Sequence, residues 1–155
     1  MGTSSDRGVS LVETIVVIAV VSVLFAMAFG AFNTLNSGKA LETDALRVAL
    51  ELQEARSLTV SSKDAQQYGV HFASSSVTRF EGASFVAGSP ANVTTALNQA
   101  VIVSSTTLSG GSVDVVFKRL SGETAQSGTV VLSLAASSTI LKTIMIYKTG
   151  VAEVQ

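Results

Sequence analysis

The sequence predicts an α+β fold in which helical segments come first and antiparallel strands follow. Residues 14–32 contain no Asp, Glu, Lys or Arg and are apolar on every side of a helix. Residues 39–60 carry apolar positions at steps of three and four, the spacing of an amphipathic helix. Residues 67–155 are rich in Val, Ile and Thr and are punctuated by glycines, which is typical of strands and turns. Helix followed by many short strands indicates an α+β domain.

The first element is an apolar helix over residues 9–32. Its charge-free part, residues 14–32, would be roughly 28 Å long at about 1.5 Å per residue, close to the thickness of a bilayer's hydrocarbon core. One acidic residue, Glu13, stands at its start. A carboxylate is costly to place in lipid, so its presence at this position indicates a function.

The second element is an amphipathic helix over residues 39–60. Its apolar stripe, which we expect to pack on a sheet, consists of Leu41, Ala45, Val48, Leu52, Ala55 and Thr59. The charged residues lie mostly off this stripe and are predicted to form a solvated face: Glu42, Asp44, Arg47, Glu51, Glu54 and Arg56. Between the two helices, residues 33–38 are small and polar, which fits either a short break or the exit from a membrane.

Strands are predicted in the remainder of the chain. The Val/Ile/Thr-rich runs are 68–72, 77–80, 100–108, 113–117, 129–134, 140–147 and 151–154. Residues 144–147 are apolar at successive positions, which predicts a central strand covered on both faces. Residues 88–91 contain the only proline and are predicted to form an exposed loop.

Composition excludes several classes of protein. There is no cysteine, so disulfides, thiolate metal sites and cysteine nucleophiles are ruled out. The net charge of −1 provides no global basic field that would attract nucleic acid. With the apolar helix set aside, the remaining length suits one domain.

Residue patterns that carry catalysis are also missing. His71 is the only histidine, and neither a second ligand nor a nucleophile at a suitable spacing accompanies it, so we expect it to be structural. The chain has no P-loop and no GxGxxG sequence. The acidic residues of the strand region are too scattered for a calcium loop. The sequence therefore predicts a protein that is not an enzyme and binds no metal or cofactor.

The N-terminal residues resemble the processing site of type IV prepilins and pseudopilins. An eight-residue polar leader ends in Gly8, the apolar Val9 follows, and Glu13 is the fifth residue counted from Val9. In that family a dedicated peptidase cuts after the glycine, the new N-terminus is methylated, and the acid at the fifth mature position guides assembly. The resemblance assigns these roles to Gly8, Val9 and Glu13. The family usually has Phe or Met where this chain has Val9.

The back half is similar to minor pseudopilins of the GspH/FimT type. The similar stretches are residues 46–56 in the helix and residues 116–117, 128–132 and 143–151 in the strands. This resemblance implies a pilin-like architecture, in which one long N-terminal helix has a membrane-spanning half and an amphipathic half packed on the β-rich domain. The expected organisation is a leader (1–8), a transmembrane or filament-core helix (9–32) and a soluble globular domain (33–155).

The resemblance implies a minor pilin or pseudopilin, a structural subunit of a type IV pilus-like filament or of a type II secretion pseudopilus. The implied partners are the prepilin peptidase and methyltransferase, other pilin or pseudopilin subunits, the inner-membrane assembly platform and, before assembly, membrane lipid. The implied location is the cytoplasmic membrane, single-pass with the C-terminal domain outside the cytoplasm, and then an extracellular or periplasmic filament. Residues 151–155 contain no Arg, unlike FimT-like pilins associated with DNA capture, so nucleic acid is not an expected partner.

Two alternatives remain open at this point. Residues 26–28 fit a conventional signal-peptide cut, which would release a secreted β-rich binding domain beginning at Phe29. Against this, Asp6 offsets Arg7, so the leader is not clearly positive. The other alternative is a filament-tip subunit that captures a ligand with its sheet loops.

We expect the mature protein to begin at Val9 and to carry one N-terminal methyl group, as measured by the intact mass of protein extracted from membranes. Gly8→Leu should block processing, because a bulky side chain should not fit where the family's peptidase accepts glycine. A mature N-terminus at Phe29, or an intact leader in cells that contain the peptidase, would contradict this prediction.

Overall fold

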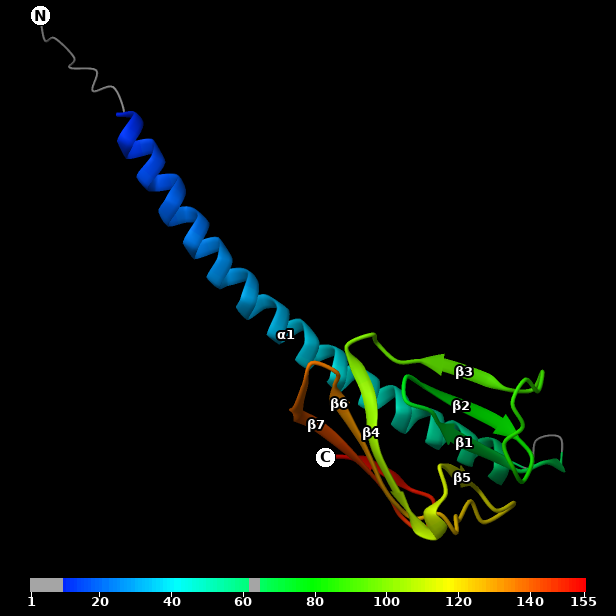
Figure 1. Cartoon of the computed structure of the whole chain (residues 1–155). Coiled ribbons are helices and arrows are strands. Elements are labelled where there is room, and N and C mark those ends of the chain that lie inside the picture. Colours follow the sequence, from blue (N-terminus) through cyan, green and yellow to red (C-terminus); the bar gives the residue numbers. More distant parts are fainter. Residues whose placement is uncertain (1–9, 62–64) are drawn as a thin grey trace, which may run out of the picture. The chain divides into compact units, whose positions relative to one another are not determined.

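The computed structural model describes residues 10–61 and 65–155, and at residues 28–35 it describes the backbone alone. The chain divides into two compact units, Met1–Asn36 and Ser37–Gln155. One helix, α1 (Leu11–Val60), has residues in both units, and the strands that follow belong to the second unit (Figure 1). The architecture is α+β, as the order of the predicted elements indicates.

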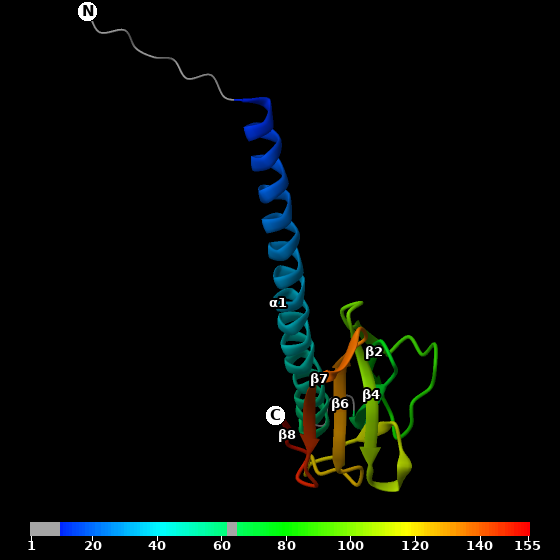
Figure 2. The ribbon, with the colours of Figure 1, turned by 60° about the vertical axis from the view of Figure 1, so that its left-hand side comes forward.

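The second unit contains two four-stranded sheets, one with the order β3-β2-β1-β5 and the other with the order β4-β6-β7-β8. Every pair of neighbouring strands is antiparallel. Figure 2 shows the strands of the second sheet side by side. The strands are β1 (Tyr68–Phe72), β2 (Ser76–Glu81), β3 (Val93–Ala96), β4 (Val101–Leu108), β5 (Asp114–Val116), β6 (Gly128–Leu134), β7 (Ser137–Ile146) and β8 (Ala152–Val154). A short 3₁₀ helix, η2 (Ser109–Gly111), follows β4.

The predicted apolar stripe of the amphipathic helix is confirmed. Its six residues are each at most 2% exposed: Leu41, Ala45, Val48, Leu52, Ala55 and Thr59. Thr59 is the only polar member, and its hydroxyl is satisfied because it donates to the carbonyl of Ala55 (2.8 Å) and accepts from the amide of Tyr68 (3.0 Å). The backbone of α1 also continues through residues 33–38, so the short break that the sequence left open does not occur.

This stripe packs into one hydrophobic core together with residues of both sheets. Val70 and Val115 come from the first sheet, and Leu132 and Ile144 come from the second. Most of the core side chains are aliphatic, as the absence of Trp and the low aromatic content require. Burial of apolar surface is the dominant favourable contribution to folding, so the helix stripe is the element on which the domain depends.

The prediction of a solvated charged face is wrong at three positions, Asp44, Glu51 and Arg56, the last of which is described with the site below. Asp44 is 1% exposed, and its Oδ2 accepts a hydrogen bond from the amide of Asn98 at 2.7 Å. Glu51 is largely buried and accepts a hydrogen bond from the hydroxyl of Thr95 at 2.8 Å. Arg79 of β2 reaches this carboxylate from the sheet, with its Nη1 3.5 Å from Glu51 Oε2. The partners lie far along the chain, so helical periodicity alone could not reveal them.

The strand predictions hold in the main, with two differences. The sequence reading missed β3, a short edge strand with three exposed residues that pairs only with β2. β7 is internal in its sheet, as predicted. However, only Ile144 and Ile146 of the predicted run 144–147 are buried, while Met145 is partly buried and Tyr147 is exposed, so this run is covered on one face and not on both.

The open edge of β5 is closed by side chains instead of another strand. The amide of Val116 donates to Oε1 of Gln126 at 3.2 Å. The hydroxyl of Thr124 donates to the carbonyl of Val116 at 2.9 Å. Both backbone groups of Val116 that face away from β1 therefore have partners, and this edge offers no free hydrogen bonds at that residue.

We expect Leu52→Ala to lower the free energy of unfolding of a fragment beginning at Asn33 by about 2–5 kcal/mol, because it empties a fully buried position. Leu50→Ala is the matched control: the same side chain, two residues away, is 62% exposed and should cost no more than about 0.5 kcal/mol. Urea unfolding followed by circular dichroism measures both. Equal losses would show that the buried stripe does not stabilise the domain.

Candidate functional site

The first part of α1 presents apolar side chains on all sides. The large apolar residues that are exposed here are Leu11, Val12, Ile15, Val16, Val17, Ile18, Val20, Val21, Val23, Leu24, Phe25 and Met27. Soluble monomers rarely expose a continuous apolar surface of this extent. A helix of this kind requires lipid or other helices around it.

The hydroxyl groups of this segment are satisfied within the helix itself. Thr14 Oγ1 donates to the carbonyl of Ser10 at 3.3 Å, and Ser22 Oγ donates to the carbonyl of Ile18 at 2.7 Å. Such bonds to the residue four positions earlier remove the need for outside partners. The segment is thereby suited to surroundings without water, where an unsatisfied polar group is costly.

Glu13 is the one charged side chain of residues 10–27, and it lies in the first turn of α1. Its carboxylate is exposed and has no ion pair within the described residues. A negative charge is favourable in the first turn because it faces the positive end of the helix dipole. The other two predicted site residues, Gly8 and Val9, lie outside the described residues, so the structure gives no distance from either to Glu13.

In the part of the chain that the structure describes, no helix combines the length and the apolar character needed to cross a bilayer. The predicted membrane segment, residues 9–32, lies partly outside that description, since Val9 and the side chains of residues 28–32 are not included.

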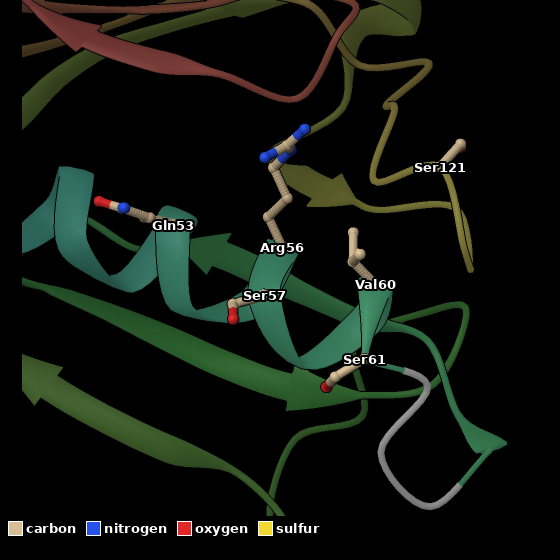
Figure 3. Close-up of a pocket in the computed structure, with 6 residues that line it drawn as sticks. All are labelled: Gln53, Arg56, Ser57, Val60, Ser61 and Ser121. Carbon is tan, nitrogen blue, oxygen red and sulfur yellow. The ribbon is translucent and has the colours of Figure 1, made fainter.

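A second feature lies at the C-terminal end of α1, where a hollow of about 420 Å³ opens to solvent. Figure 3 shows its lining, with Ser121 reaching it from a separate turn: Gln53, Arg56, Ser57, Val60, Ser61 and Ser121. Arg56 Nε donates to the carbonyl of Gly122 at 3.2 Å. A Cβ on Gly150 would lie only 1.9 Å from that same carbonyl oxygen. Arg56 therefore fastens two closely packed turns to the helix, which is a structural role.

Sequence reasoning missed this arrangement because Arg56 seemed to belong to a solvated face. The available signal was the spacing of glycines, since Gly122 and Gly150 both adopt left-handed conformations, with φ of 67° and 79°. Left-handed glycines in two separate turns indicate close backbone packing. They do not indicate which side chain the turns pack against.

His71 is a structural residue, as its isolation in the sequence predicts. Its Nδ1 lies 2.6 Å from Oδ1 of Asp114, the residue opposite it on β5. Its ring stacks on Phe85, with ring centroids 4.0 Å apart and planes only 4° from parallel. These contacts tie β1 to β5 and to the connection after β2. Within residues 10–61 and 65–155, no group of three or more His, Cys, Asp or Glu side chains could hold a metal ion.

Two comparisons with known proteins agree with this description. A family profile described as "Prokaryotic N-terminal methylation motif" matches residues 3–29. The crystal structure of the type IV minor pilin FimU from Pseudomonas aeruginosa is similar in fold, with a TM-score of 0.57 and 14% sequence identity. The similarity covers 74% of this chain and 92% of FimU. No curated protein sequence matches the chain.

The long helix with its largely apolar first part, the antiparallel domain and the N-terminal motif define a class: this is a pilin-like fold. The chain thus combines a pilin-like fold with a prokaryotic N-terminal methylation motif over residues 3–29. The resemblance read from the sequence is confirmed at this level.

We expect Gly150→Ala to destabilise the domain more than Gly88→Ala. Both glycines are left-handed, with φ of 79° and 78°, so each alanine should cost about 1–2 kcal/mol of backbone strain. A Cβ at residue 88 meets open space, whereas at residue 150 it collides with the carbonyl of Gly122. Urea unfolding of the two variants tests this packing, and equal costs would contradict it.

Proposed function

We propose that this protein is a minor pilin or pseudopilin, a structural subunit processed after Gly8 and assembled into a filament through its N-terminal helix. The observation that carries the proposal is the exposed apolar surface of residues 11–27, interrupted by the single carboxylate of Glu13. Two findings support it. The methylation motif matches residues 3–29, at the N-terminus, and the fold is pilin-like over 74% of the chain.

Residues 9–32 hold the subunit in the cytoplasmic membrane before assembly, with the β-rich domain outside the cytoplasm. The apolar side chains suit lipid, and the internally bonded hydroxyls of Thr14 and Ser22 add little cost there. During assembly the helix leaves lipid and packs against the helices of other subunits. This exchange of lipid for helix contacts has no large hydrophobic drive, so it needs a specific interaction to direct it.

The carboxylate of Glu13 supplies that interaction. A carboxylate buried among apolar helices without a partner would be strongly unfavourable. Cleavage after Gly8 creates a free amine at Val9, and on a neighbouring subunit this amine is the natural partner. An uncleaved subunit has no amine at that position, so processing by the prepilin peptidase licenses assembly. The membrane platform that drives assembly is a further implied partner.

The similarity in fold to FimU, a type IV minor pilin, supports a type IV pilus over a type II secretion pseudopilus as the filament. The alternative of a secreted binding domain released near Ala28 is less well supported. The backbone of α1 runs from Leu11–Val60 without interruption, so that cut would fall inside a helix. The methylation motif also extends to residue 29 and includes the supposed cut.

We expect Glu13→Leu to reduce incorporation into filaments by at least about tenfold, because the Val9 amine of the neighbour would be buried without a partner at a cost of several kcal/mol. Membrane insertion should be unchanged or improved, since an acid costs up to about 2.5–3.5 kcal/mol at the centre of a membrane helix and less near its end. Val12→Leu introduces the same side chain one position away and should assemble normally.

The measurement is the amount of each variant in sheared filaments relative to the membrane fraction, in cells that also produce the wild-type major subunit. Equal incorporation of Glu13→Leu and Val12→Leu would refute the charge-pair mechanism and leave the processing site untouched. A subunit at the filament tip is a defined exception, because no subunit lies above it to supply the amine, and a mild defect would then indicate that position.

A further inference from the structure

The two ends of the β-rich domain differ in charge. One end lies beside residues 39–44 of α1 and is formed by three connections that are bonded to one another or to the helix. The carboxylate of Asp44 accepts from the amide of Asn98, the amide of Ala135 donates to the carbonyl of Ala100, and the amide of Leu97 donates to the carbonyl of Ser75.

We call this part of the domain the uncharged end: it consists of residues 73–75, residues 97–100, the turn 135–136 and the first part of β7, residues 137–141, and it contains no charged residue. The opposite end lies at the C-terminal end of α1 and is formed by the turns after β5 and β7, which are joined by a bond from the amide of Thr124 to the carbonyl of Lys148. Those turns carry Lys118, Arg119, Glu123 and Lys148. The two ends therefore differ in the charge that their turns carry.

The uncharged end exposes apolar side chains at its tip. Ile140 is 40% exposed and Leu141 is 51% exposed, and the two follow the exposed Ser138 and Thr139. Lys142 comes next in β7. The hydrogen bond and the charge of Lys39 lower the pKa of Glu42 on α1, and the positive charge of Lys142 makes a smaller contribution in the same direction. An apolar tip flanked by hydroxyls and lysines is the composition of a surface that rests in lipid headgroups.

Chain connectivity brings this end close to the membrane whatever the angle between the two units. Phe32 ends the apolar segment and Lys39 begins the amphipathic part of α1. Seven residues span at most about 25 Å when fully extended, at about 3.3–3.6 Å per residue, and only about 10 Å as helix. A subunit anchored by residues 9–32 therefore holds the uncharged end within reach of the headgroup layer.

We propose that the uncharged end, with Ile140 and Leu141 at its tip, docks on the surface of an anionic membrane while the subunit is anchored before assembly. This inference rests on the membrane stage of the proposed function and adds a second point of contact to the helix. The contact fixes the orientation of the domain on the membrane, and it must be released when the subunit enters a filament.

The observations favour lipid over a protein partner for this surface. Two large apolar side chains are far too few for a stable protein interface, which typically buries about 800 Å² on each partner. A weak contact with lipid is nevertheless effective here, because the anchored helix keeps the domain at a high local concentration near the membrane. Lys142 adds attraction to anionic headgroups, whereas the charge of Lys39 is paired with Glu42 at 3.0 Å.

The absence of cysteine allows a direct test on the full chain. Ser138→Cys at the uncharged end and Ser121→Cys at the opposite end each provide a single exposed site for an environment-sensitive fluorophore. The labelled proteins are reconstituted in vesicles of phosphatidylcholine and phosphatidylglycerol that contain lipids with a headgroup quencher. We expect strong quenching at residue 138 and little at residue 121, because strands of about 20 Å separate the two ends at about 3.3 Å per residue.

Replacing the tip should abolish the difference. Ile140→Ser combined with Leu141→Ser should reduce quenching at residue 138 to the level at residue 121, whereas Val86→Ser, which removes an exposed apolar side chain from another loop, should leave it unchanged. Vesicles of phosphatidylcholine alone should give weaker quenching. Equal quenching at the two labelled positions would overturn the proposal, and so would quenching that appears only at a high ratio of protein to lipid, because that result indicates contact between subunits.

Flotation of the vesicles distinguishes the failure of this inference from the failure of the proposed function. Protein that floats with the vesicles but shows no preferential quenching at residue 138 overturns the docking alone. Protein that does not float overturns the membrane anchoring, and the docking with it.

Discussion

Both sheets of this protein depend on one surface, the apolar stripe of α1 between Leu41 and Thr59. Each sheet is small and contributes part of a core that closes only when the helix covers it. A sheet that is apolar on one face must bury that face against another layer. The helix is also the element that carries the subunit into its proposed filament. Folding of the domain and its attachment to the assembly segment are therefore achieved by the same helix.

The carboxylates of α1 have different tasks according to where they lie. Glu51 and Glu54 meet Arg79 of β2, and Asp44 accepts a hydrogen bond from the β3–β4 connection, so these three fix the sheet and loops on the helix. Glu13 has no such partner within the described residues. An acid whose partner must come from elsewhere is suited to recognition between subunits, whereas acids already paired within the domain are suited to stability.

What the sequence predicted correctly depends on short-range information. The stripe of α1 is visible because it repeats every three or four residues, and most strands are visible because β-branched residues cluster between glycines. The candidate site was also proposed from local order, that of Gly8, Val9 and Glu13, and it stays a prediction. β3 was missed because Val93–Ala96 is short and largely polar. It is stabilised by pairing with β2, which precedes it in the sequence. Asp44, Glu51 and Arg56 were misjudged because their partners are 44 to 66 residues away in the chain.

The side chains that close the edge of β5 reduce the risk of aggregation where many subunits lie close together. Subunits held in a membrane or a filament meet one another at concentrations where exposed strand edges would join and aggregate. Gln126 and Thr124 occupy the backbone groups of Val116 that a foreign strand would need. Unwanted polymerisation through the sheets is thereby disfavoured at this edge, and ordered growth is left to the helix. Residues 11–27 can therefore expose a continuous apolar surface while the β-rich domain resists aggregation through the edge of β5.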